Sequence, residues 1–169
     1  MRKGDNTQKV FFELIRSGLW RKANDNLDYG HDVDWNAVYQ LAEEQSVVGL
    51  VAAELEWVKE NDSQFKVPKT VALPFVGKTL QIELRNKAMN EFVAGLIEGL
   101  RREGVHALLV KGQGVAQCYE KPLWRSSGDI DLVLSIDNYE KAKTLLVPMA
   151  SDVKGEGVGS KHLGMTIDG

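Results

Sequence analysis

Two aspartates separated by one residue, Asp129 and Asp131, are the clearest chemical signal in this sequence. They lead into a predicted strand over 130–134, and residues two apart on a strand point to the same face. Neighbouring carboxylates repel each other, and apolar neighbours make them costly to bury unless a cation joins them. Mg²⁺ prefers oxygen ligands and commonly takes one or two carboxylates together with substrate phosphates. The pattern predicts metal-assisted phosphoryl or nucleotidyl transfer, the alternative being a strand edge with two solvated acids.

A turn containing Lys111, Gly112 and Gln113 is predicted to follow a buried strand over 106–110 and to open a short helix. Such a turn presents backbone N–H groups to an anion, and glycine lets a phosphate approach closely. The segment is not a P-loop, because the pattern G-x-x-x-x-G-K-[ST] is absent. Lys111 could neutralise a triphosphate or cap carbonyls at the strand end, and the glycine could serve the turn geometry alone.

Arg125 stands four residues before Asp129 in a polar loop. A guanidinium group can bind a phosphate through two parallel hydrogen bonds. It could equally pair with Asp129 and hold the loop in place. Both roles remain open from the sequence.

The elements that must position these residues divide the chain into a helical front and an α/β back. Apolar residues at helical spacing predict a helix over 34–60, or two shorter ones broken near 46–49, and a further helix over 80–103. Short apolar runs predict strands over 106–110, 130–134 and 162–167. We therefore expect an α+β fold, with a helical N-terminal region over 1–79 and a small mixed-sheet core over 80–169.

The composition narrows the class of protein. The chain has 169 residues with 21 basic and 24 acidic side chains, so its net charge is −3. It lacks the global basic field that a long nucleic acid would need. The sequence has no apolar run long enough for a membrane helix. The single cysteine, Cys118, fits a reducing compartment, so we expect a cytoplasmic protein.

The combined pattern resembles the nucleotidyltransferase superfamily, which has the polymerase-beta-like fold. It is most similar to a little-characterised bacterial group, through Leu-Val-Lys-Gly at 109–112, Arg125 and Gly-Asp-Ile-Asp-Leu at 128–132. The resemblance implies that Asp129 and Asp131 bind Mg²⁺ or Mn²⁺, and that Gly112 and its neighbours hold the phosphates of a nucleoside triphosphate. An unidentified hydroxyl-bearing acceptor would receive the nucleotide. Gln113 departs from the usual second glycine or serine.

The resemblance also implies a third acid on a later strand. Asp168 and Gly169 form an Asp-Gly turn signal after an apolar strand, so a returning strand should follow. We expect the third carboxylate to lie beyond residue 169, in a longer parent protein, and this chain to be weakly active or inactive alone. The alternative is a non-catalytic nucleotide-binding or antitoxin-like module that acts with a protein partner.

Overall fold

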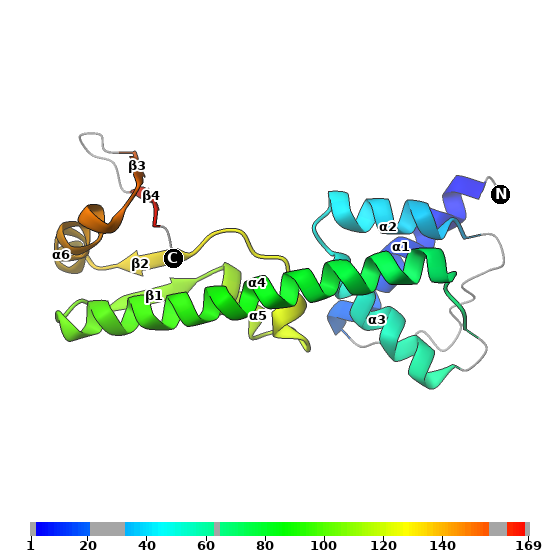
Figure 1. The fold of residues 1–169 in the computed structure, drawn as a ribbon. Helices are drawn as coiled ribbons and strands as arrows, with labels where there is room; N and C mark the ends of the chain where they lie inside the picture. Colours follow the sequence, from blue (N-terminus) through cyan, green and yellow to red (C-terminus); the bar gives the residue numbers. More distant parts are fainter. Residues whose placement is uncertain (1–2, 21–32, 63–64, 156–161, 168–169) are drawn as a thin grey trace. The chain divides into compact units, whose positions relative to one another are not determined.

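The computed structural model describes residues 3–20, 33–62, 65–155 and 162–167, and it confirms an α+β fold with a helical N-terminal region (Figure 1). The described residues fall into two compact units. Unit 1 comprises Met1–Lys87 and Gly112–Gly128, and unit 2 comprises Ala88–Lys111 and Asp129–Gly169. The chain passes from one unit to the other after Lys87, after Lys111 and after Gly128, and the last two crossings lie within the segments that carry the predicted site residues.

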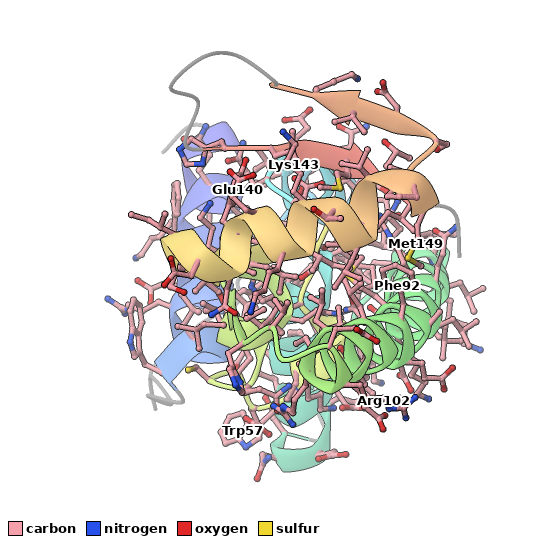
Figure 2. All side chains as sticks on the ribbon, turned by 90° about the vertical axis from the view of Figure 1, so that its left-hand side faces the viewer. Trp57, Phe92, Arg102, Glu140, Lys143 and Met149 are labelled. Carbon is pink, nitrogen blue, oxygen red and sulfur yellow. The ribbon has the colours of Figure 1, made fainter. Side chains whose placement is uncertain are left out.

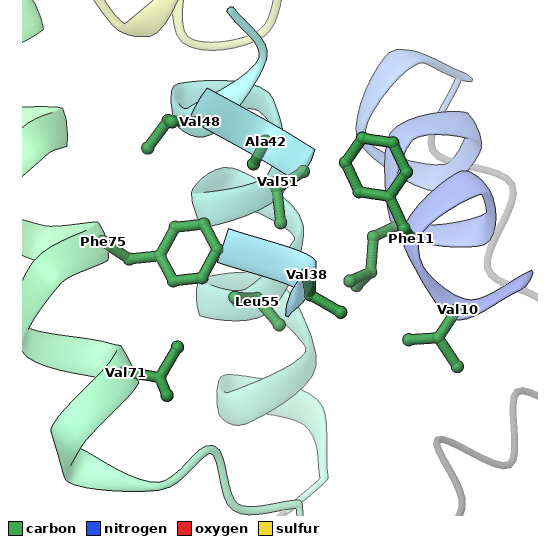
Figure 3. Packing of buried hydrophobic residues seen from close by; sticks show 10 residues of the cluster. Val10, Phe11, Val38, Ala42, Val48, Val51, Leu55, Val71 and Phe75 are labelled. Carbon is green, nitrogen blue, oxygen red and sulfur yellow. The ribbon is translucent and has the colours of Figure 1, made fainter. Parts of the chain in front are cut away.

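Unit 1 is built on a helical core that contains α1 (Lys3–Trp20), α2 (Trp35–Glu44), α3 (Val48–Asn61) and the beginning of α4 (Lys69–Arg102). Their apolar stripes meet in one cluster, shown in Figure 3. The stretch predicted over 34–60 is two helices, because the chain turns at Ser46, whose φ is 57°. The backbone N–H of Val47 donates to the carbonyl of Ala42 at 2.9 Å, which closes the end of α2.

Helix α4 begins at Lys69, eleven residues before the predicted start at residue 80. Pro74 lies inside the helix, although proline normally ends or kinks one because it lacks an N–H. Burial explains the difference: Val71 and Phe75 are 2% and 3% exposed in the core of unit 1. The helix ends near Gly104 as predicted, where a φ of 74° suits glycine.

Unit 2 contains the C-terminal part of α4 and an antiparallel pair, β1 (Ala107–Val110) and β2 (Asp131–Leu134). Helix α6 (Ile136–Leu146) completes its core, where Leu100 and Ala142 are buried, and the 3₁₀ turn Val147–Met149 follows this helix. Figure 2 shows Phe92 of α4 close to Met149, and both line a largely apolar groove.

A second antiparallel pair joins β3 (Asp152–Lys154) to β4 (Gly164–Thr166). The strand predicted over 162–167 is thus present but shorter, and β3 was not predicted because three residues carry almost no periodic signal. The sheet expected to be mixed consists, over the described strands, of two antiparallel pairs. The predicted turn at Asp168 and Gly169 lies outside the described residues.

Candidate functional site

In unit 2, the β1–β2 register places Asp131 beside the residue that precedes the glycine turn. Val110 pairs with Asp131, and Lys111 Nζ lies 3.4 Å from Asp131 Oδ1. The side chains of Lys111 and Asp131 are 75% and 39% exposed. Solvent therefore screens this ion pair, and its contribution to stability is small. The carboxylate of Asp131 thus has a basic neighbour and remains accessible to an incoming ligand.

Asp129 lies before β2 rather than on it. The strand begins at Asp131, one residue later than predicted, so the alternation of strand side chains does not relate Asp129 to Asp131. Asp129 is exposed. The described residues include no group of three or more His, Cys, Asp or Glu side chains arranged to hold a metal. Two accessible carboxylates nevertheless suit Mg²⁺, which commonly completes its coordination with water and substrate phosphates.

The turn between β1 and helix α5 (Gly112–Ala116) has two consecutive residues with positive φ. Lys111 has a φ of 53° and Gly112 a φ of 28°. Glycine adopts such angles readily, whereas a non-glycine residue does so rarely, and such backbone strain tends to gather at functional sites. This local geometry gives the Lys-Gly dipeptide a structural explanation as well as the predicted phosphate-binding one.

The Gln113 side chain is buried in unit 1, with 5% of the residue exposed. Its Nε2 donates to the side-chain Oδ1 of Asn86 at 3.3 Å and to the Asn86 carbonyl at 3.4 Å. Its Oε1 has no hydrogen-bond partner in the described part of the chain. Any contact of Gln113 with a phosphate therefore falls to its backbone rather than to its amide.

Arg125 holds together the loop and the turn of unit 1. Its Nη1 donates to the carbonyl of Gly112 at 3.3 Å, to the carbonyl of Ser126 at 3.2 Å and to Ser127 Oγ at 2.8 Å. One nitrogen of the guanidinium thus helps to hold the loop, but through these three acceptors and not through the pairing with Asp129 that the sequence left open. The Nε and Nη2 groups make no hydrogen bond with other described residues, so they remain available to a ligand.

The sequence did not reveal Asn86, which is 1% exposed on α4. Its Nδ2 donates to the carbonyls of Leu123 and Arg125, both at 2.7 Å. A usable signal existed: Asn86 follows Ile82 by four residues, so a polar side chain interrupts an apolar helical stripe. The bonds explain why it is there, since a buried amide must be hydrogen-bonded.

Trp124, in the 3₁₀ turn Pro122–Trp124, is held from three sides within unit 1. Its Nε1 donates to Glu83 Oε2 at 3.0 Å, and Lys121 Nζ lies 3.9 Å from the centre of its ring. Hydrogen bonds from Lys87 and then from Trp124 lower the pKa of Glu83. The Trp124 carbonyl packs against Gly49, where any Cβ atom would overlap it. These contacts fix the segment that leads to Arg125.

An α+β chain with a Lys-Gly turn after one strand and an Asp-x-Asp motif at the start of the next is typical of nucleotidyltransferases. Residues 31–165 match the model of a protein family described as an uncharacterised nucleotidyltransferase, and the chain belongs to this family. Membership supports a nucleotidyltransferase-type function. Neither a curated protein nor a solved structure matches the chain significantly. No helix among the described residues is long and apolar enough to cross a membrane.

Proposed function

We propose that the protein transfers a nucleoside monophosphate from a nucleoside triphosphate to a hydroxyl-bearing acceptor. One observation carries the proposal: the match to the nucleotidyltransferase family spans residues 31–165 and so includes every predicted site residue. Those residues supply the two kinds of group that nucleotidyl transfer needs, namely carboxylates for a divalent metal and basic or backbone donors for phosphates.

Asp129 and Asp131 are the proposed ligands of Mg²⁺ or Mn²⁺. Asp129 is exposed and Asp131 is partly exposed, and Lys111 Nζ lies 3.4 Å from Asp131 Oδ1. When bound, the metal would polarise the α-phosphate and stabilise the charge that develops during displacement. The role of the two aspartates is to hold that charge at a fixed place on the chain.

The proposed phosphate ligands are Lys111, the backbone of Gly112 and Gln113, and Arg125. Lys111 contributes a mobile positive charge, whereas Arg125 contributes a guanidinium already held by Gly112, Ser126 and Ser127. A preorganised donor loses less conformational entropy when it binds a ligand than a free one does. Arg125 is therefore the residue that we propose to give specificity for the triphosphate. Lys111 would attract the triphosphate through its charge alone.

The test is binding of Mg²⁺–ATP by calorimetry, with pyrophosphate release as the measure of transfer, for the wild-type chain and for Asp129→Asn and Asp131→Asn. Asp137→Asn, which changes an acid in the first turn of α6, is the control. We expect the two site variants to lose binding by about tenfold or more, equivalent to about 1.4 kcal/mol, and the control to bind normally. Equal binding by all four proteins would falsify the metal-ligand assignment.

The same experiment separates this function from a non-catalytic role. Nucleotide binding without pyrophosphate release, in the presence of varied hydroxyl-bearing acceptors, would favour the nucleotide-binding or antitoxin-like module with a protein partner. A small acceptor fits the net charge of −3 better than a long nucleic acid does. A cytoplasmic location is part of the same proposal, since nucleoside triphosphates are abundant there and Cys118 is the single cysteine.

A further inference from the structure

Unit 1 contains a cavity of about 260 Å³ beside Arg125, here called the Tyr119 pocket. Helices α1 and α3 and the turn after α2 form one wall, and residues 119–121 and 124–126 form the other. Its volume lies just under the range of about 300–1,000 Å³ for pockets that hold drug-sized ligands. The pocket suits a small molecule and is too small for a macromolecular surface. The residues that line it include Gln45, Ser46, Ala53, Tyr119, Arg125 and Ser126.

Arg125 gives the pocket a fixed positive charge. Its Nη1 is held by acceptors of the chain, while Nε and Nη2 make no hydrogen bond within the described residues. Its guanidinium carbon lies 5.8 Å from the centre of the Tyr119 ring, which further limits its movement. A guanidinium held in this way is suited to a phosphate or carboxylate group.

The other charged residues of the lining already have partners. Lys121 forms an ion pair with Glu56 and lies over the Trp124 ring, and Glu120 also has an interaction of its own. Arg125, by contrast, has two nitrogens, Nε and Nη2, that make no hydrogen bond within the described residues. An anionic group is therefore the charge type that the pocket can accept with the least rearrangement.

Several neutral polar groups complete the lining. The hydroxyl groups of Tyr119, Ser46 and Ser126 and the amide of Gln45 make no side-chain hydrogen bond with other described residues. Hydroxyl and amide groups both donate and accept, so they match the hydroxyl groups of a polyol. Gln45 and Ser46 are exposed and can bond to water, whereas Tyr119 and Ser126 are half-buried, so an apolar ligand that covered their hydroxyl groups would leave them unpaired at a cost in free energy.

We propose that the Tyr119 pocket binds a small molecule with one phosphate or carboxylate group and several hydroxyl groups. The pocket's preference for an anionic polyol follows from its own lining and volume. The preference can therefore be measured without any nucleotide.

Calorimetry and ligand-observed NMR on the full chain, without nucleotide, test this preference with four probes: ribose 5-phosphate, gluconate, ribose and inorganic phosphate. At least one of the two anionic polyols should bind about tenfold more tightly than ribose or phosphate, since a charged hydrogen bond adds to those of the hydroxyl groups. Ribose 5-phosphate and gluconate distinguish a phosphate from a carboxylate ligand. Equal affinity for all four probes, or no binding of either anionic polyol, overturns the proposal.

Two variants place the binding in this pocket. Ala53→Leu fills the cavity from α3 without altering the loop, and Arg125→Lys keeps the charge but removes the guanidinium. Each should weaken binding of the anionic polyol by about tenfold. The controls Ala88→Leu and Arg85→Lys change exposed positions on α4 and should bind as the wild type does. Wild-type affinity in a folded Ala53→Leu protein overturns the location.

Titration with Mg²⁺–ATP of the same proteins separates the two proposals. If the anionic polyol binds and Mg²⁺–ATP does not, the proposed nucleotidyl transfer fails while the ligand preference of the pocket stands. If Mg²⁺–ATP binds and neither anionic polyol does, the pocket proposal fails alone. Where both bind, Ala53→Leu should lose the polyol and keep Mg²⁺–ATP.

Discussion

The Asn86 side chain donates from Nδ2 to the Arg125 carbonyl at 2.7 Å. The same nitrogen donates to the carbonyl of Leu123, while Asn86 Oδ1 accepts from Gln113 Nε2. Arg125 in turn donates to the carbonyl of Gly112. The four residues Asn86, Gln113, Arg125 and Gly112 therefore form one hydrogen-bonded set, which fixes the glycine turn and the arginine loop of unit 1 with respect to each other.

Replacing Asn86 by alanine should destabilise the protein more than loss of a surface amide would. The change leaves the carbonyls of Leu123 and Arg125 without their buried donor, and each unsatisfied group costs about 1–3 kcal/mol. We expect the free energy of unfolding, measured by urea titration, to fall by about 2–4 kcal/mol. Asn90→Ala, a half-buried asparagine on the same helix, is the control and should change it by less than about 1 kcal/mol. Similar losses in the two variants would argue against the role of Asn86.

Gly49→Ala should displace the Trp124 segment, because a Cβ at residue 49 would overlap the Trp124 carbonyl oxygen. The backbone of residue 49 packs against the backbone of Trp124, so relieving the overlap would require one of the two backbone segments to move. We expect a loss of about 1–3 kcal/mol in unfolding free energy, the range typical of overpacking. Gly77→Ala is a matched control on α4, where a Cβ would have no atom within 4 Å. It should instead stabilise the protein by about 0.5–1 kcal/mol, because alanine favours the helix. In thermal melts, Gly49→Ala should lower the melting temperature and Gly77→Ala should raise it.

Helical periodicity predicted the elements of unit 1 well, yet it misplaced the start of α4. Pro74 signals a break, and the local preference is real, since proline inside a helix costs about 3 kcal/mol. The residues on either side of it explain the outcome. Val71 and Phe75 are both buried, and the Phe75 ring packs edge-on against Tyr39 with centroids 4.9 Å apart. Burial of these two side chains thus outweighs the tendency of Pro74 to break the helix, and burial cannot be seen in the sequence around the proline.

The candidate site shows a different limit of sequence reasoning. Residue types and spacing were enough to identify Lys111, Gly112, Arg125 and the two aspartates as candidates, because those patterns are local. The direction in which a side chain points, by contrast, depends on contacts with residues that are distant in the sequence. Gln113 lies in the predicted turn, but burial turns its amide toward Asn86. Asn86 itself is separated from Arg125 by 39 positions, so only the folded chain shows that they meet.

The lowered pKa of Glu83 predicts how stability depends on pH. Hydrogen bonds from Lys87 and then Trp124 favour the ionised carboxylate in the folded state. Its contribution is therefore present above the pKa of the unfolded chain and is lost as the pH falls through the lower pKa of the folded one. Glu83→Gln should be less stable than the wild type at neutral pH. The difference should shrink as the pH falls below the ordinary glutamate pKa of about 4.3.

Urea titrations of the wild type and of Glu83→Gln measure this difference in stability. They should run from neutral pH to about pH 3, an interval that includes the ordinary pKa of glutamate. Glu91→Gln, an exposed change on the same helix, provides the control and should show little dependence of this kind. A difference between Glu83→Gln and the wild type that stays constant over the whole range would show that ionisation of Glu83 plays no part.

Replacing Lys111 by methionine should change metal binding and nucleotide binding in opposite directions. Lys111 Nζ lies 3.4 Å from Asp131 Oδ1, so its charge competes with a metal ion for that carboxylate. Without the lysine, Mn²⁺ alone should bind the chain as tightly as before or more tightly. Mg²⁺–ATP should bind about tenfold more weakly, because a positive charge near the phosphates is lost.

Unit 2 supplies a matched control for Lys111→Met in the pair Lys154 and Asp152, whose Nζ and Oδ2 lie 3.1 Å apart. Both ion pairs are largely exposed, with 82% and 50% of the two side chains accessible in the control. Lys154→Met should therefore leave both affinities unchanged. Calorimetry with Mn²⁺ and with Mg²⁺–ATP measures the two effects. If Lys111→Met weakened both to the same extent, the lysine would act on the fold of the β1–β2 end rather than on its ligands. If it weakened neither, Lys111 would have no part in binding the triphosphate, and its ion pair with Asp131 would be a surface contact alone.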